Sequence, residues 1–374
     1  MTTDTIGGVW DYSLELAAGL AEHGISVDLA ALGAAPQPAR LRPIPGLRLY
    51  HLDCRLEWMR DSEEDVARSG DWLLALERRT RPDIVHVNGF AHAALPFPAP
   101  VLAVVHSCVL SWWRHVHGAD APAEWNGYAG RVRAGLAAAR LVTAPTRAML
   151  EEARALYGPL PHARVLHNGR DPRRYPPGRK EPLVLGAGRL WDDAKNVAAL
   201  AAAAKHLEWP VVLAGAADHP EGGSIPLDGV RCLGALPSAE LARWFARAAV
   251  FAMPARYEPF GLSVLEAAMA GCALVLGDIG SLRELWDEAA LFVPPDDVEA
   301  LASAIRRLAA DDALRDRMSD AARTRARRYT ADRMTEGYVS AYSDILVEPA
   351  AGFPFAGRGA ATAAPAILPS PAER

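Results

Sequence analysis

Cysteine is scarce in this sequence. Its 374 residues include four cysteines, Cys54, Cys108, Cys232 and Cys272, and no two of them have the C-x-x-C spacing. Such scattered positions indicate neither a zinc site nor a disulfide framework, so we expect a reduced, cytoplasmic setting. The residues after Met1 do not form a basic and then apolar segment, which argues against a signal peptide.

Long hydrophobic runs and an excess of positive charge are also missing. The most apolar long stretch, residues 94–113, contains three prolines and a histidine, so it fits a loop that leads into a buried strand better than a membrane span. The formal net charge of −5 argues against a protein that coats nucleic acid. A late arginine cluster favours the solvated face of a helix, with a peripheral membrane contact as the alternative. The cluster consists of Arg323, Arg325, Arg327 and Arg328.

Short β-rich apolar runs alternate with helical patterns along most of the chain. The expected strands are 26–32, 84–87, 101–105, 141–144, 164–167, 183–185, 211–214, 250–253, 273–276 and 290–293. The expected helices are 9–22, 63–79, 125–139, 146–156, 194–206, 239–248, 261–270, 281–286 and a stretch from 298 onward. This alternation is typical of parallel sheets with crossover helices, and therefore predicts an α/β fold.

Length and composition predict two domains. A chain of this length with 51% apolar residues is large enough for two cores. Residues 171–182 are rich in proline, glycine and charge, and are expected to link two Rossmann-like domains, 1–170 and 183–330, that face each other across a cleft. A further helix is expected over 331–347. The alanine- and proline-rich tail 348–374 is expected to be disordered.

The segment from Glu258 to Glu266 places two carboxylates around a predicted helix start. Pro259 restricts Glu258 to an extended conformation just before the helix, and Glu266 is expected to project from the first turns. Unpaired backbone N–H groups at the positive end of the helix dipole would suit a phosphate. These N–H groups belong to Phe260, Gly261 and Leu262. The alternative is an ordinary loop and helix with a carboxylate facing solvent.

This segment, E-P-F-G-L-S-V-L-E, resembles the E-P-F-G-L-x-x-x-E signature of the retaining glycosyltransferases of family 4. The resemblance implies a GT-B fold whose final helix crosses back to the first domain. It also implies transfer of a hexose from a nucleoside diphosphate sugar, UDP- or GDP-linked, to a hydroxyl of a glycan, lipid or small molecule. In that assignment Glu258 contacts the donor sugar, Glu266 binds the ribose, and the amides between them hold sugar and phosphate oxygens. The acceptor and the oligomeric state stay open.

Two cations are expected at the carboxyl end of a strand in the second half. Arg189 and Lys195 lie in the segment G-A-G-R-L-W-D-D-A-K-N. A departing nucleoside diphosphate develops negative charge, so a forked guanidinium and a mobile ammonium would stabilise the transition state. In family 4 enzymes, G-R-L followed by K-N is the diphosphate clamp. The alternative is a loop with surface charges.

Gly7 and Gly8 precede the first expected helix and would let the backbone approach a phosphate or sugar closely. Their pattern is not G-x-G-x-x-G, so a nicotinamide site is poorly supported. The family resemblance implies that they line the cleft beside the donor diphosphate. Relatives begin with a buried strand before this loop, whereas only residues 1–4 precede it here. We therefore expect the first strand to be largely absent, or the true start to lie upstream, and the stability to be reduced.

Four further residues of the first half are candidates for contact with sugars. His106 follows an expected strand, and an imidazole there could hydrogen-bond a hydroxyl of the transferred sugar. His86 and Asn88 also lie at a strand's carboxyl end and are candidates for the acceptor, with packing or loop capping as the alternative. Trp112 belongs to an expected aromatic loop that would stack on a sugar or cover the cleft, with a core contact as the alternative.

The resemblance also implies a mechanism without a protein nucleophile or a metal. The departing phosphate oxygen takes the proton of the incoming hydroxyl on the same face, through a transition state of oxocarbenium character. The cations and the helix start replace a metal ion, and the sequence has no Asp-x-Asp motif. A nucleotide-sugar epimerase, a glycoside phosphorylase and a non-catalytic nucleotide-sugar binder remain as alternatives.

Overall fold

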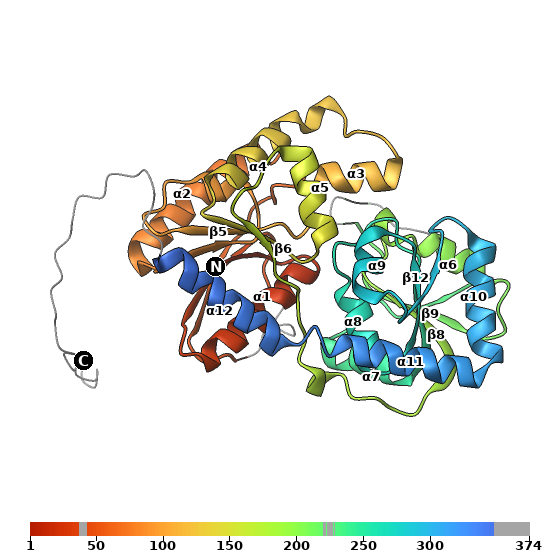
Figure 1. The fold of residues 1–374 in the computed structure, drawn as a ribbon. Helices are drawn as coiled ribbons and strands as arrows, with labels where there is room; N and C mark the ends of the chain where they lie inside the picture. The colour runs from red at the N-terminus through yellow and green to blue at the C-terminus, as the bar shows by residue number, and fades with distance from the viewer. Residues whose placement is uncertain (37–42, 220–221, 223–226, 228, 348–374) are drawn as a thin grey trace, which may run out of the picture.

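The computed structural model describes residues 1–36, 43–219, 222, 227 and 229–347. Figure 1 shows two α/β lobes side by side, joined where the chain passes from the first to the second and where it returns. The tail expected to be disordered, 348–374, lies outside the described residues.

The first lobe contains two parallel sheets. Three strands form the order β1-β2-β3, and four form β4-β5-β6-β7. Their bounds are β1 Thr2–Asp4, β2 Val27–Leu32, β3 Leu47–Leu52, β4 Val85–Val87, β5 Val101–Val104, β6 Leu141–Ala144 and β7 Ala163–Val165. The helices are α1 Gly8–Glu22, α2 Glu63–Thr80, α3 Val109–His117, α4 Asn126–Ala138 and α5 Arg147–Tyr157. Asn88 bridges the two sheets, because its backbone N–H donates to Thr2 Oγ1 and its Nδ2 to the Thr2 carbonyl.

The second lobe is built on one parallel sheet of six strands, in the order β10-β9-β8-β11-β12-β13. Their bounds are β8 Glu181–Ala187, β9 Val211–Ala214, β10 Arg231–Cys232, β11 Ala248–Met253, β12 Ala273–Gly277 and β13 Leu291–Val293. The helices are α6 Val197–Ala204, α7 Ser238–Arg247, α8 Leu262–Met269, α9 Gly280–Trp286, α10 Val298–Ala310 and α11 Asp312–Ala326. The residues of β11 and β12 are buried throughout, as expected for strands covered by helices on both faces.

The final helix, α12 Ala331–Val347, returns to the first lobe and lies beside α1 (Figure 1). Its buried side chains, including Tyr338 and Tyr342, join the core formed by α1, β2 and β5. The helices approach so closely that a Cβ at Gly19 would lie 2.0 Å from Thr335 Oγ1. The predicted α/β fold with a helix crossing back is therefore confirmed.

The two chain segments that connect the lobes are hydrogen-bonded to each other. Arg170 N–H donates to the Tyr329 carbonyl at 3.2 Å, and Ala331 N–H donates to the Arg170 carbonyl at 3.0 Å. A Cβ at Gly169 would lie 2.1 Å from the Thr330 carbonyl oxygen, so this position needs glycine. We call residues 169–175 and 329–331 the interdomain crossing.

Several sequence-based expectations about elements were wrong. The first strand is present, because Thr2–Asp4 pairs in parallel register with β2. The predicted aromatic loop is the helix α3, which is capped at its start by the Cys108 side chain and is followed by Gly118 in the left-handed conformation. The strand β3 was not predicted at all. Three of its six residues are exposed, and its polar side chains hide the apolar pattern of an edge strand. Finally, β8 begins at Glu181, inside the expected linker.

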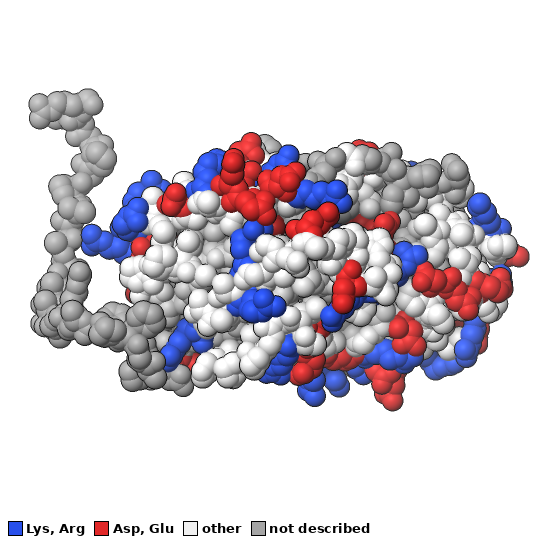
Figure 2. Space-filling view, turned by 90° about the horizontal axis from the view of Figure 1, so that it is seen from above, with Lys and Arg blue, Asp and Glu red and all other residues white. Residues whose placement is uncertain are grey.

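The surface carries charges of both signs. Figure 2 shows Lys and Arg interspersed with Asp and Glu over the face in view, without a broad field of positive charge. Among the described residues, no helix is both long and apolar enough to cross a membrane.

Candidate active site at the junction of the lobes

The loop after β8 carries the two predicted cations. Arg189 Nη2 donates to Asp192 Oδ2 at 2.7 Å, and Lys195 Nζ donates to Glu258 Oε2 at 2.6 Å. Asp192 also caps the short turn that follows, since its Oδ1 accepts from Ala194 N–H at 3.0 Å. Without a ligand, each cation is thus neutralised by a carboxylate that belongs to the same site.

Asp192 is a site residue that the sequence analysis missed. Its side chain is 2% exposed. Burial opposes its ionisation, but the Arg189 and Lys195 cations hold its pKa below the ordinary value. The indole Nε1 of Trp112 also donates to Asp192 Oδ1, at 2.9 Å. Helix α3 of the first lobe therefore contacts the cation loop of the second lobe directly.

Glu258 lies where the sequence predicts it, just before α8, but it uses the amides that were expected to be unpaired. Its Oε1 accepts from the Gly261 N–H at 2.9 Å and from the Phe260 N–H at 3.4 Å. Gly261 has a φ of 83°, which lets the chain turn sharply into α8. A ligand phosphate would need Glu258 to release these two amides, so the prediction that they stand open is corrected.

Glu266 projects from the first turns of α8, as the sequence predicts, and its side chain is directed into the protein interior. Its Oε1 accepts from Arg170 Nε at 2.7 Å, and its side chain is 10% exposed. Burial raises the pKa of Glu266, and the Arg170 guanidinium opposes that rise. One oxygen of this carboxylate is thus taken up by the interdomain crossing.

The glycine loop of the first lobe lies against the second lobe. A Cβ at Gly7 would lie 3.4 Å from Arg189 Nη1, and a Cβ at Gly8 would lie 3.2 Å from Leu262 Cδ1. Gly7 also has a φ of 79°, a conformation that side chains disfavour. The structure therefore brings Gly7, Gly8, Arg189 and Leu262 together at the junction.

His106 and Asn88 form a polar pair whose protonation follows from their partners. Asn88 Nδ2 donates to the Thr2 carbonyl at 2.8 Å, so Asn88 Oδ1 faces His106 Nε2, also at 2.8 Å. Because that oxygen only accepts, the His106 proton is on Nε2 and its Nδ1 is an acceptor. Burial lowers the pKa of His106 to about 3, so the ring is neutral near pH 7. Such a ring can accept a hydrogen bond from a sugar hydroxyl.

The other two first-lobe candidates serve protein contacts. His86 is 3% exposed, and its Nδ1 lies 2.6 Å from the Tyr342 hydroxyl of α12. It belongs to the core, which favours the packing alternative over acceptor binding. Trp112 is half-buried and is held by its bond to Asp192, so it links the lobes.

Further contacts between the lobes surround this group. Ser111 Oγ lies 2.7 Å from the Tyr257 hydroxyl, and Thr146 Oγ1 donates to the Pro259 carbonyl at 3.0 Å. The Glu284 carboxylate accepts from the backbone N–H groups of Arg147 and Ala148, at 2.8 and 2.9 Å, and so caps α5 from the opposite lobe. The candidate site thus lies at an ordered junction of the lobes.

Sequence comparison now places this geometry in a family. The model of a family described as Glycosyltransferase Family 4 matches residues 6–174, and that of Glycosyl transferases group 1 matches residues 181–311. The chain belongs to these glycosyltransferases. Glycogen synthase of Mycobacterium tuberculosis is 30% identical over 286 residues, which cover 67% of this chain and 66% of that enzyme. The match thus spans about two thirds of that relative's length.

Solved glycosyltransferase structures share the fold. Sucrose-phosphate synthase from Thermosynechococcus elongatus superposes with a TM-score of 0.79 at 22% identity, over 92% of this chain and 95% of that one. Anabaena HepE in complex with UDP-glucose gives a TM-score of 0.69 at 15% identity, over 92% of this chain and 100% of that one. These likenesses confirm the predicted two-domain GT-B architecture. Among the described residues, no group of three or more His, Cys, Asp or Glu side chains is arranged to hold a metal ion.

Proposed function

We propose that this protein is a retaining glycosyltransferase that moves a hexose from a nucleoside diphosphate sugar to a hydroxyl acceptor. The observation that carries the proposal is the meeting of Arg189, Lys195 and Glu258 with the Gly7-Gly8 loop where the lobes join. Two cations beside a backbone that lacks side chains suit a diphosphate, and an adjacent carboxylate suits sugar hydroxyls.

In this proposal the donor replaces the internal partners of the cations. The diphosphate takes the place of Asp192 on Arg189 and of Glu258 on Lys195. Glu258 then becomes an acceptor for hydroxyls of the transferred sugar, and the Phe260 and Gly261 amides become available to donor oxygens. Before the donor binds, the internal partners reduce the free-energy cost of burying several charges in the site, because each charge is already paired.

The same residues would stabilise the transition state. Negative charge grows on the departing diphosphate as the glycosidic bond breaks, and Arg189 and Lys195 face that charge. Neutral His106 accepts a hydrogen bond from a hydroxyl of the transferred sugar through Nδ1. The departing phosphate oxygen takes the acceptor's proton on the same face, so the new bond keeps the anomeric configuration. Glu266 binds the ribose, and the Leu262 amide, with those of Phe260 and Gly261, holds donor oxygens.

We further propose UDP as the donor nucleotide and residues 1–170 as the acceptor side. Support for UDP comes from HepE, which shares the fold and is solved in complex with UDP-glucose. Support for the acceptor side is that the charged groups proposed for the donor, Arg189, Lys195 and Glu258, all belong to the second lobe, which leaves the facing lobe for the acceptor. The domain bounds 1–170, 171–182, 183–330 and 331–347 belong to the same proposal.

Turnover of a panel of nucleotide sugars tests the function. The protein is incubated with UDP-glucose, GDP-mannose and ADP-glucose and with candidate acceptors, and release of the nucleoside diphosphate is measured. We expect release with one donor, and its loss in Lys195→Ala. Lys205→Ala is the matched control, because Lys205 is exposed at the end of α6. Epimer formation, phosphorolysis, or binding without turnover would each contradict the proposal.

A further inference from the structure

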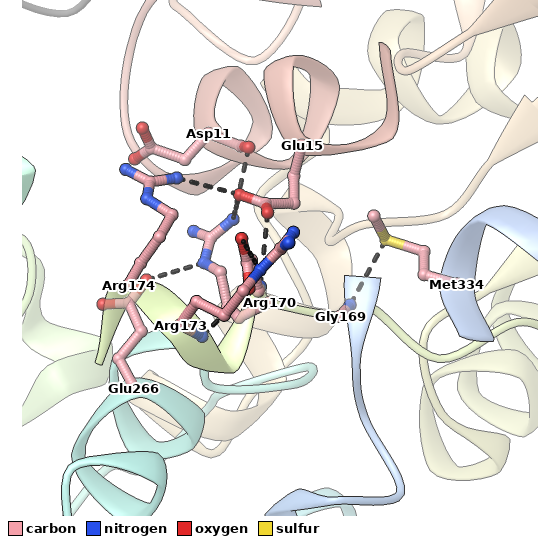
Figure 3. Close-up of polar contacts among 9 residues, drawn as sticks. Asp11, Glu15, Gly169, Arg170, Arg173, Arg174, Glu266 and Met334 are labelled. Carbon is pink, nitrogen blue, oxygen red and sulfur yellow. Dashed lines mark hydrogen bonds and ion pairs between the residues drawn. The ribbon is translucent and has the colours of Figure 1, made fainter. Parts of the chain in front are cut away.

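A buried charge cluster lies behind the candidate site, at the interdomain crossing. Figure 3 shows side chains from three places converging there: α1 of the first lobe, the crossing itself, and α8 of the second lobe. Arg170 is central. Its side chain is 3% exposed, although it sits between two domains.

Arg170 contacts both lobes with one guanidinium. Its Nε donates to Glu266 Oε1 on α8 at 2.7 Å, and its Nη1 donates to the Asp11 carbonyl on α1 at 3.2 Å. The Nη1 atom also lies 3.9 Å from Glu15 Oε2 on α1. A guanidinium is a planar fork with five donors, which suits a residue that must hold several acceptors in fixed directions.

The cluster is anchored on its first-lobe side by Glu15. This carboxylate is 4% exposed and accepts from Arg174 Nη1 at 3.0 Å. It also accepts from the Asp171 N–H at 3.2 Å. The crossing is therefore fastened to α1 by side chain and backbone, and α1 begins at the Gly7-Gly8 loop beside Arg189.

We propose that Arg170 is a positioning residue that holds Glu266 for the donor nucleotide and ties it to α1. The inference rests on the proposed function, in which Glu266 accepts hydrogen bonds from the ribose. Arg170 occupies Glu266 Oε1 and so fixes the carboxylate's orientation. Through α1, the same contact fixes the position of the nucleotide-binding carboxylate relative to the Gly7-Gly8 loop beside the diphosphate.

The charge state of Glu266 gives this role a measurable signature. The charged and titratable groups that act on it are Asp11 on α1 and Arg170 and Tyr175 on the crossing, and the Tyr175 hydroxyl also hydrogen-bonds to it. Glu15 and Arg174 lie next to this group, where Glu15 pairs with both Arg170 and Arg174. Burial raises the pKa of Glu266, and Arg170 is the cation in direct contact that opposes the rise. Arg170 holds that pKa down both by its charge and by its hydrogen bond to Oε1, so replacing the guanidinium by lysine, which removes this Nε–Oε1 hydrogen bond and keeps the charge, should raise the pKa further. An un-ionised Glu266 has lost acceptor capacity for the ribose, so nucleotide affinity should then fall as the pH falls.

The experiment measures UDP affinity by calorimetry between about pH 6 and pH 9 for wild type, Arg170→Lys and Arg173→Lys. Arg173 is the matched control, because it lies on the same segment with an 82% exposed side chain. We expect Arg170→Lys to bind UDP more weakly, with affinity falling by up to about tenfold per pH unit below the raised pKa of Glu266. The terminal phosphate of UDP titrates in the same range, so wild type sets the reference profile; Arg173→Lys should follow it, and the affinity of Arg170→Lys should fall below it increasingly as the pH falls.

A double-mutant cycle separates positioning from a general effect on the fold. In a Glu266→Gln background, Arg170→Lys should change UDP affinity little, because Arg170 acts on the ligand through the Glu266 carboxylate, which this background lacks. If Arg170→Lys does not fold, Glu15→Gln replaces it in the same cycle, since this variant loosens the anchor of Arg170 and leaves Glu266 in place.

Two results would overturn the inference. One is an unchanged UDP affinity and pH profile in Arg170→Lys, or in Glu15→Gln where it stands in. The other is a loss of UDP affinity that is as large in the Glu266→Gln background as in the wild-type background. If wild type binds none of UDP, GDP and ADP, the proposed function fails and the inference falls with it, which distinguishes the two failures.

Discussion

The two lobes place different chemistry at the junction. The second lobe contributes charged pairs, Arg189 with Asp192 and Lys195 with Glu258, whereas the first contributes the neutral pair His106 and Asn88. Charges that are paired before a ligand arrives suit a polyanion that can exchange with the internal carboxylates. Neutral acceptors suit hydroxyl groups. In the proposed function, this difference assigns donor binding to the second lobe and the orientation of the sugar hydroxyls to the first.

Removing a cation from the second lobe should have the largest effect. Arg189→Ala is expected to lower kcat by about 100-fold or more, because the growing charge on the diphosphate loses a forked donor. The measurement is steady-state release of the nucleoside diphosphate. Arg247→Ala is the control, since Arg247 pairs with Glu181 at an exposed position. A wild-type kcat in Arg189→Ala would contradict the proposal that this cation of the second lobe stabilises the departing diphosphate.

Substitutions of the two site glutamates should have different effects, one on turnover and the other on nucleotide binding. Glu258→Gln is expected to lower kcat by roughly 10- to 100-fold with little change in UDP affinity, because its carboxylate faces the reacting sugar. Glu266→Gln is expected to weaken UDP binding by about tenfold, because a charged acceptor is lost. Glu240→Gln, at an exposed position on α7, should do neither. Wild-type kinetics in both site variants would refute their assignment.

Removing the histidine of the neutral pair in the first lobe should have a smaller effect on kcat/KM, and that effect should not depend on pH. His106→Phe is expected to lower kcat/KM by roughly 2- to 10-fold, the magnitude of one neutral hydrogen bond. Because the pKa of His106 is lowered to about 3, this ring contributes no titration near neutral pH. The ratio of wild-type to variant kcat/KM should therefore stay constant from about pH 5.5 to pH 8. A ratio that changes with an apparent pKa near 6 would show that His106 acts as an imidazolium.

Acid should destabilise the first lobe through its neutral histidines. Burial lowers the pKa of His92 to about 4 and holds that of His86 well below the ordinary value. The unfolded chain, with a histidine pKa of about 6.5, binds these protons first, so stability is lost as the pH falls below about 6.5. Each buried histidine should cost about 2 kcal/mol at pH 5.

His92 offers the simpler test of this acid sensitivity, because its ring contacts Ser69 and lies away from the site residues. We expect His92→Gln to lose less thermal stability than wild type between pH 7 and pH 5. His206→Gln, on an exposed histidine of the second lobe, should behave as wild type. Equal acid sensitivity in His92→Gln and wild type would contradict the neutral state of this ring.

The sequence predicted the alternation of strands and helices well, because strands buried on both faces are continuous apolar runs. The elements it missed lack such runs. β3 has only exposed and half-buried residues, and α3 hides its helical pattern among tryptophans and histidines. The three-residue β1 was missed for another reason: pairing with β2 stabilises a segment too short to be recognised alone.

The sequence predicted those site residues that belong to a local motif. It did not predict contacts between residues that lie far apart along the chain. The Glu258 and Lys195 motifs were both predicted to belong to one site, and the structure brings their side chains within hydrogen-bonding distance. Nothing local revealed that Trp112 would bond to Asp192, or that Arg170 would reach Glu266, because 80 and 96 residues separate these pairs along the chain. Such contacts arise only when the two lobes pack.

The central claim is that Arg189 and Lys195 exchange their internal carboxylates for a diphosphate. Calorimetric comparison of UDP with UMP tests it most directly, because the two ligands differ only in the second phosphate. The account predicts that wild type binds UDP more tightly than UMP by at least about tenfold, and that Lys195→Ala loses most of this difference. Equal affinities for UDP and UMP in wild type, or an unchanged preference in Lys195→Ala, would contradict it.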